Sequence, residues 1–115
     1  VTGFDRVMLY KFDDDGHGEV LAEEKVEVME SYLGLHFPES DIPTPARKMF
    51  LSNWIRLIPD ANADPVSLYP AHNPITQQPT DLTLSILRSP YVCHIEYLHN
   101  MGVCASLTIS LMKDD

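Results

Sequence analysis

The sequence predicts an α+β domain with an antiparallel sheet flanked by helices. Strand-like apolar segments lie near both ends of the chain, at residues 6–12 and 103–112, and helix-like segments lie between them. Strands and helices that do not alternate regularly favour this class over a parallel α/β sheet. The length of 115 residues suits one domain. The sheet is expected to be incomplete, because the chain stops directly after its clearest strand.

Composition excludes several classes of function. The chain carries 17 acidic and 8 basic residues, a net charge of −9, which disfavours a nucleic-acid partner because phosphate binding needs clustered lysine and arginine. No run of about 18 apolar residues predicts a membrane span. Two cysteines do not form a disulfide scaffold, so a reducing cytoplasm is expected. Because the chain does not begin with Met, we expect it to be cut from a longer polypeptide.

The first part of the chain reads as a β-hairpin. Residues 6–12 are rich in apolar and aromatic side chains, and residues 19–26 form a second strand with polar interruptions. The Asp and Gly residues at 13–18 predict the turn between them. A calcium loop is disfavoured there, because the spaced carboxylates and the later Glu of that motif are missing.

An irregular loop, a helix and a strand are expected next. Residues 31–43 show no clean period and contain two prolines and a glycine, which predicts an ordered loop. Thr44 is suited to cap a helix that has Pro45 at its first position. The apolar segment 55–58 predicts a short strand.

A long connection follows. Residues 59–80 contain five prolines, with a short strand expected at Val66–Tyr69. A loop of this length is often functional, although a variable surface loop is an equally good interpretation. A helix is expected from Thr80 or Asp81 through Leu87.

The last part of the chain predicts one more helix and one more strand. The helix covers Tyr91–Met101 and ends at Gly102. In the strand at residues 103–112, apolar residues alternate with hydroxyl residues, a period of two. The apolar positions are Ala105, Leu107, Ile109 and Leu111, and the hydroxyl positions are Ser106, Thr108 and Ser110. On this pattern alone, the hydroxyl face is expected to point to solvent.

The helix at 91–101 carries the most reactive group of the chain. Cys93 and Tyr97 are four residues apart and share one face, and His94 lies on the adjoining stripe. A core helix with a buried thiol explains this pattern as well as a nucleophilic site does. A Cys-His hydrolase is disfavoured, because adjacent helical residues diverge by about 100°.

Three further features are candidate ligand contacts. Asp41-Ile42-Pro43 lies in the irregular loop, where its carboxylate and nearby carbonyl groups could organise a turn or accept from the N–H groups of a ligand. Arg56 lies in an otherwise apolar strand and Arg88 shortly precedes the helix. Either guanidinium could be an exposed charge, and Arg88 could also be a favourable charge at a helix C-terminus. If they face inward, both suit bidentate capture of carboxylates.

Three blocks of sequence resemble the GAF domain of phytochromes, especially the cyanobacterial ones. They are residues 3–12 (GFDRVMLYKF), 34–43 (GLHFPESDIP) and 87–103 (LRSPYVCHIEYLHNMGV). Lesser matches fill most of the remainder, so the resemblance covers nearly the whole chain. It implies a single GAF domain over residues 1–115, truncated at both ends and lacking its last strand and terminal helices.

The resemblance implies a covalent linear tetrapyrrole, phycocyanobilin or phytochromobilin. Cys93 would form a thioether with its A-ring side chain, and His94 would pack against it and help keep the inner nitrogens protonated. Asp41 would hydrogen-bond near those nitrogens and the rotating D ring. Arg56 and Arg88 would pair with the two propionates.

The remaining implied contacts concern the D ring and one propionate. Tyr10, Tyr97 and Phe37 would flank the D ring, and Ser106 and Thr108 would point into the pocket, which reverses the solvent expectation for the hydroxyl face. Phe37 stands where the family often has Tyr, so one D-ring hydroxyl is absent. The cofactor-binding residues implied are Cys93, His94, Asp41, Arg56, Arg88, Tyr10, Phe37, Ile42, Pro43, Tyr97, Ser106 and Thr108.

The resemblance therefore implies a red/far-red photoreceptor module that signals by light-driven D-ring isomerisation. No catalysis is expected beyond self-attachment of the pigment, and no metal. Companion PAS and PHY domains, a histidine kinase-type output domain and homodimerisation would belong to the full-length protein. Two alternatives stay open: a GAF domain for another small ligand such as a cyclic nucleotide, and a thiol-dependent methionine sulfoxide reductase that would use Cys93 with Cys104.

Overall fold

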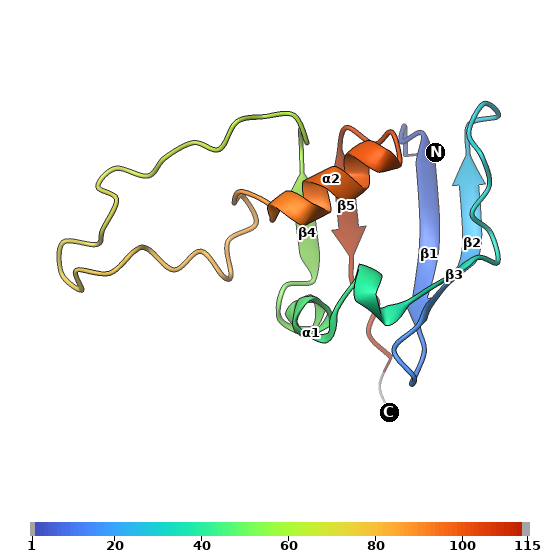
Figure 1. Cartoon of the computed structure of the whole chain (residues 1–115), viewed down its shortest axis with the longest axis horizontal. Coiled ribbons are helices and arrows are strands. Elements are labelled where there is room, and N and C mark those ends of the chain that lie inside the picture. The colour runs from blue at the N-terminus through green and yellow to red at the C-terminus, as the bar shows by residue number, and fades with distance from the viewer. Residues whose placement is uncertain (1, 114–115) are drawn as a thin grey trace. The chain divides into compact units, whose positions relative to one another are not determined.

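The computed structural model describes residues 2–113 and has the predicted α+β composition, with antiparallel strands and two α-helices (Figure 1). The chain divides into two compact units, residues 1–48 and residues 49–115. No helix among residues 2–113 has the length and apolar character that a membrane crossing requires.

The first unit is built on a three-stranded antiparallel sheet in the order β1-β2-β3. Strands β1 (Arg6–Phe12) and β2 (Gly18–Lys25) form the predicted hairpin. Strand β3 (His36–Phe37), which the sequence did not predict, pairs with the start of β2. A bulge interrupts β1 and β2: Leu9 pairs with Ala22, but Tyr10 pairs with Val20. Bulges of this kind bend a strand and redirect its side chains.

An ion-pair network anchors the loop after β2. The Glu23 carboxylate, almost fully buried, accepts from the Ser31 hydroxyl at 2.6 Å and from the Tyr32 N–H, and lies 3.1 Å from Arg6 Nη1. The guanidinium of Arg6 stacks on the Tyr32 ring at 3.7 Å and donates to the Glu30 carbonyl. These bonds lower the pKa of Glu23, chiefly through the Ser31 hydroxyl. A loop without regular structure is thereby held in one conformation.

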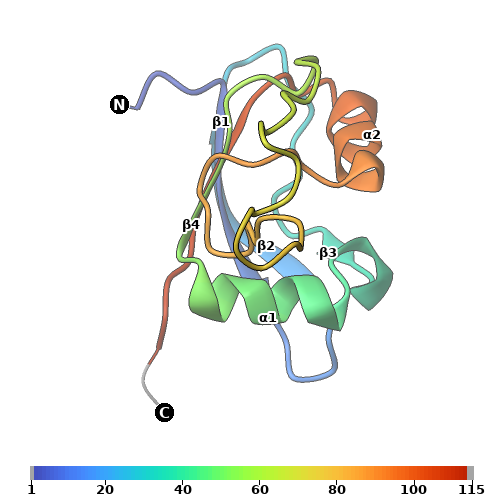
Figure 2. The same ribbon diagram turned by 90° about the vertical axis from the view of Figure 1, so that its left-hand side faces the viewer.

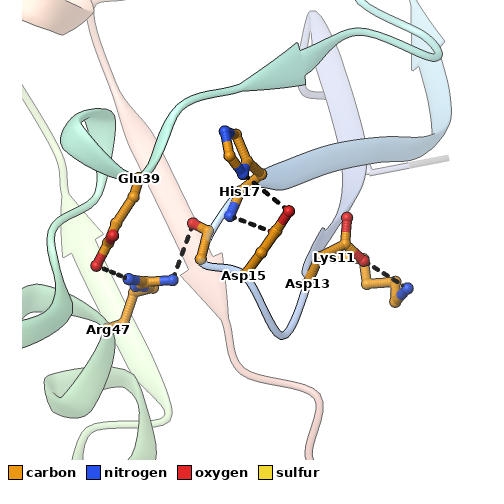
Figure 3. Close-up of polar contacts among 7 residues, drawn as sticks. Lys11, Asp13, Asp15, His17, Glu39 and Arg47 are labelled. Carbon is orange, nitrogen blue, oxygen red and sulfur yellow. Dashed lines mark hydrogen bonds and ion pairs between the residues drawn. The ribbon is translucent and has the colours of Figure 1, made fainter.

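A second network joins the hairpin turn to the short helix η1 (Glu39–Asp41) (Figure 3). Arg47 donates to the Gly16 carbonyl at 2.9 Å and pairs with the Glu39 carboxylate. Within the turn, Lys11 pairs with Asp13 and His17 with Asp15. Arg47 therefore fixes the segment that carries Asp41.

Helix α1 (Thr44–Ser52) begins where the sequence predicts and leads into the second unit. The Thr44 hydroxyl donates to Glu39 Oε1 at 2.7 Å, which adds to the network around η1.

The second unit pairs β4 (Ile55–Ile58) with β5 (Ser106–Ile109), and helix α2 (Val92–Asn100) packs on this ribbon (Figure 2). Its buried cluster joins Ile58 of β4, Ala61 and Leu98 of α2. Gly102 follows the helix with φ of 70°, the left-handed conformation that ends many helices and that glycine adopts without strain. The β4 and α2 predictions are confirmed within one residue at each end.

The prediction of a helix at residues 80–87 is wrong, because that segment forms turns. Asp81 Oδ1 accepts from the Thr83 N–H at 2.9 Å, a local turn that competes with helix formation. The Thr83 carbonyl accepts from Asn53 and Arg88 side chains instead of a helical amide. Leu84 is 73% exposed, so no apolar packing favours a helix. The strand expected at Val66–Tyr69 is also not formed, and this connection extends away from β4 and α2 (Figure 1).

Strand β5 is shorter than predicted. Its apolar face is exposed and its hydroxyl face is partly covered, the reverse of most strands that have one face in a core. The apolar side chains Leu107 and Ile109 are exposed, whereas Ser106 and Thr108 are half-buried. Direct antiparallel partners share a face, and Ser106 pairs with Ile58, which contacts α2. The hydroxyl row therefore lies on the side of the ribbon that α2 covers, and the solvent expectation is wrong.

Candidate functional site

Helix α2 presents the thiol and the imidazole at its first turn. Tyr91 precedes the helix in an extended conformation, and the His94 N–H donates to its carbonyl at 2.9 Å. Leu98, one turn further on, holds the helix against the β4–β5 ribbon. The positions of Cys93 and His94 are therefore set by the core of the second unit.

Cys93 is exposed and is not in a disulfide, and the same is true of Cys104. The Cys93 thiol lies near enough to the Tyr91 phenol to raise the pKa of Tyr91. The interpretation of Cys93 as a buried core thiol is thus wrong. Tyr91 is a site residue that sequence reasoning missed, although its place two residues before the cysteine was visible.

His94 is half-buried beside a positive charge. Burial lowers its pKa, and the nearby Arg56 guanidinium lowers it further. Arg56 itself has a lowered pKa, first through burial and then through the charge of Arg88. Neutral imidazole is therefore favoured for His94 next to the Arg56 guanidinium, which is itself repelled by Arg88.

The two arginines line one cavity. It has a volume of about 420 Å³ and is lined by Arg56, Arg88, Ser89, Pro90 and Tyr91. Arg88 donates to the Thr83 carbonyl at 3.2 Å, and Arg56 lies over the Phe50 ring at 5.4 Å. Among residues 2–113, no carboxylate forms an ion pair with either guanidinium. Such a cavity attracts an anionic ligand.

Two further predicted residues, Ser106 and Thr108, lie on β5 opposite the strand that carries Arg56. Thr108 of β5 is the direct partner of Arg56 of β4, and Ser106 is the partner of Ile58, so both hydroxyl residues lie on the Arg56 face. Tyr97, on α2, is 37% exposed. The structure therefore collects seven of the twelve predicted residues in the second unit.

The other five predicted residues belong to the first unit. Tyr10 lies on β1, Phe37 on β3 and Asp41 on η1, with Ile42 and Pro43 directly after it. The Tyr10 and Phe37 rings are 6.1 Å apart, and the pKa of Tyr10 is raised by burial and by the Asp41 charge. Tyr32, whose ring meets that of Phe37 edge-on at 6.5 Å, joins this aromatic group and was not predicted.

One group of side chains among residues 2–113 has the spacing of metal ligands. Ligand atoms of Asp13, Glu19 and His36 lie within 4.8 Å of one another. Lys11 already binds the Asp13 carboxylate at 2.7 Å, and the His36 imidazole is largely exposed. The Lys11–Asp13 ion pair and the cross-strand contact between Glu19 and His36 account for this arrangement.

Comparison with known proteins finds phytochromes as similar proteins. No protein-family model matches the chain. Cyanobacterial phytochrome A of Nostoc is 69% identical over all 115 residues, and the phytochrome-like protein Cph1 of Synechocystis is 64% identical over 114 residues. Over its whole length, the chain is similar to part of these two phytochromes. It spans 15% of the length of each of these relatives.

The fold comparison agrees with this similarity. The chromophore-binding domain of the bacteriophytochrome RpBphP3 of R. palustris superimposes with a TM-score of 0.92 at 43% identity, covering 98% of this chain and 38% of that one. The α+β GAF-type fold predicted from the sequence is thereby confirmed.

Proposed function

We propose that this chain is the pigment-binding part of a red/far-red photoreceptor and holds a linear tetrapyrrole through Cys93. The observation that carries the proposal is the arginine pair. Arg56 and Arg88 lie on one cavity and form no ion pair with any carboxylate of residues 2–113, and that cavity also includes Tyr91, whose pKa is raised by the nearby Cys93 thiol. A pigment with two propionates supplies the two missing anions next to a nucleophile.

The residues present fit such a group. A cavity of about 420 Å³ lies within the usual range of about 300–1,000 Å³ for small-molecule sites. Guanidiniums suit carboxylates, and hydroxyl residues on the Arg56 face offer further hydrogen bonds. Phytochromobilin and phycocyanobilin share this chemistry, and the similarity to cyanobacterial phytochromes favours phycocyanobilin.

Cys93 and His94 of the second unit have distinct roles in this proposal. The Cys93 thiol would hold the pigment by adding across a double bond of the A-ring side chain: Sγ would bond to one carbon and the thiol hydrogen would go to its neighbour, so no oxidant would be needed. The neutral His94 imidazole offers one acceptor and one donor to pyrrole nitrogens. When bound, the tetrapyrrole supplies light absorption and double-bond isomerisation.

The first unit supplies the remaining proposed contacts. Asp41, with Ile42 and Pro43, would accept from N–H groups of the pigment. Tyr10 and Phe37 would form an aromatic wall for the D ring, together with Tyr97 of the second unit. Because its pKa is raised, the Tyr10 phenol stays protonated at neutral pH and can donate a hydrogen bond.

The remaining features of the proposal belong to the full-length protein. Light-dependent changes would be passed to PHY and histidine kinase-type output domains in a cytoplasmic homodimer. The chain itself would catalyse nothing beyond its own pigment attachment.

The test is covalent attachment. The full-length protein is co-produced with bilin-synthesising enzymes, denatured, and examined for zinc-induced fluorescence on the protein band. The proposal expects fluorescence in the wild type and in Cys104→Ser, and none in Cys93→Ser. Fluorescence that persists in Cys93→Ser, or is missing from the wild type, contradicts it.

A further inference from the structure

Gly18 of β2 leaves a gap that the Tyr10 ring fills. A Cβ atom built on Gly18 would lie 2.0 Å from the Tyr10 Oη and 2.1 Å from its Cζ. Real Cβ contacts are essentially never shorter than 3.0 Å. Gly18 is not among the glycines with positive φ, so its backbone suits any residue. Space for Tyr10, rather than conformational freedom, therefore explains the glycine.

The strand register explains how Tyr10 reaches this gap. Phe12 of β1 and Phe37 of β3 are both direct partners of Gly18, so the three residues form a row on one face of the sheet. The middle position of the row has no side chain. After the bulge, Tyr10 pairs with Val20, two residues from Gly18, and its ring lies diagonally over the glycine.

Two neighbouring aromatic rings limit how far the Tyr10 ring can move from this position. The centroid of the Tyr10 ring is 5.3 Å from that of Phe12, with an angle of 74° between the ring planes, and 6.1 Å from that of Phe37. A methyl group on Gly18 would push the phenol out from between them. The Asp41 charge that acts on Tyr10 would then act on a displaced hydroxyl.

We propose that Gly18 is a positioning residue that sets the orientation of the Tyr10 phenol toward the pigment. This inference rests on the proposed function, because Tyr10 is one of its pigment contacts. Gly18 acts only through Tyr10, so its substitution should matter only while the tyrosine ring is present.

A double-mutant cycle in the pigment-free full-length protein tests this dependence. Gly18→Ala is expected to lower Tm by about 5 °C or more. Tyr10→Leu lacks the atoms that the new methyl group would meet, so adding Gly18→Ala to it should leave Tm unchanged or raise it, since alanine is the better strand residue. The inference is overturned if Gly18→Ala lowers Tm equally in the wild-type and Tyr10→Leu backgrounds, or lowers it in neither. It is also overturned if Gly18→Ala misfolds and Tyr10→Leu does not restore folding.

The pigment-loaded proteins supply a second readout. Gly18→Ala should keep wild-type attachment at Cys93 but shift the absorption band and the photoconversion yield in the direction of Tyr10→Leu. A wild-type spectrum in Gly18→Ala overturns the inference while the proposed function stands. If the wild type attaches no pigment, the proposed function fails, and the Tm cycle alone still decides whether Gly18 positions Tyr10.

Discussion

Replacing Arg56 with Gln should weaken pigment binding strongly while sparing the pigment-free protein. Arg56 is half-buried and has no carboxylate partner among the described residues, so its loss removes one charge-assisted bond to a ligand carboxylate. Such bonds contribute about 1.5–3 kcal/mol, and about 1.4 kcal/mol is a factor of ten. The expected loss of affinity is therefore about 10- to 150-fold. Arg88→Gln should lie toward the lower end, because Arg88 also bonds to the Thr83 carbonyl.

The assay needs reversible binding, so the variants are made in a Cys93→Ser background. Free phycocyanobilin is titrated into each protein and followed by absorbance at two salt concentrations. Lys113→Gln is the matched control, because it removes one exposed positive charge from outside the cavity. The salt dependence of binding should fall in Arg56→Gln and stay unchanged in the control.

The pigment-free protein should respond in the opposite direction. Arg56 lies near Arg88 and near His94, so removing its charge relieves repulsion. We expect Arg56→Gln to leave Tm unchanged or higher and to raise the pKa of His94, followed by NMR. An affinity within twofold of the Cys93→Ser reference would refute the assignment of Arg56 to a propionate.

Three other predictions concern stability and local order. Burial lowers the pKa of His94 below its ordinary 6.5, so the native state binds fewer protons than the unfolded state. The free energy of unfolding should therefore fall as pH drops through 6.5. In chemical denaturation, His94→Gln should remove this part of the pH dependence. Arg47→Met should speed hydrogen exchange of the Asp41 amide about tenfold or more, because the bonds of Arg47 to the Gly16 carbonyl and the Glu39 carboxylate are lost, whereas Lys48→Met should not. Leu98→Ala should cost about 2–5 kcal/mol in chemical denaturation, and a loss below 1 kcal/mol would contradict its core position.

Periodic segments could be predicted from the sequence with good accuracy. The strand at residues 6–12 and the strand at 55–58 have the expected bounds, and α2 differs from its prediction by one residue at each end. In these segments apolar spacing, turn residues and the terminal Gly102 all favour the same structure. The pigment-site residues came instead from the family resemblance, because spacing alone left Cys93 as either core or nucleophile.

Segments whose structure depends on contacts distant in sequence could not be predicted. Strand β3 has two residues and exists only because β2 offers a pairing edge. The failed helix at 80–87 depended on local propensity, which side-chain bonds from Asp81 and Asn53 override. The pattern alone wrongly favoured solvent for the hydroxyl face of β5, because a period of two identifies two faces but not which of them is covered; the family resemblance had reversed that expectation.

The acidity of the chain strengthens the case that the arginine pair awaits a ligand. With 17 acidic residues and 8 basic ones, carboxylates are abundant, and the other two arginines both have them: Arg6 pairs with Glu23, and Arg47 with Glu39. Within residues 2–113, Arg56 and Arg88 form no such ion pair, although both are half-buried and repel each other. Holding two half-buried guanidiniums close together costs free energy, because they lose water and repel each other, and a bound dianion would recover that cost. A purely structural role would instead favour a nearby Asp or Glu, so the arrangement among the described residues supports the proposal that ligand carboxylates bind to this pair.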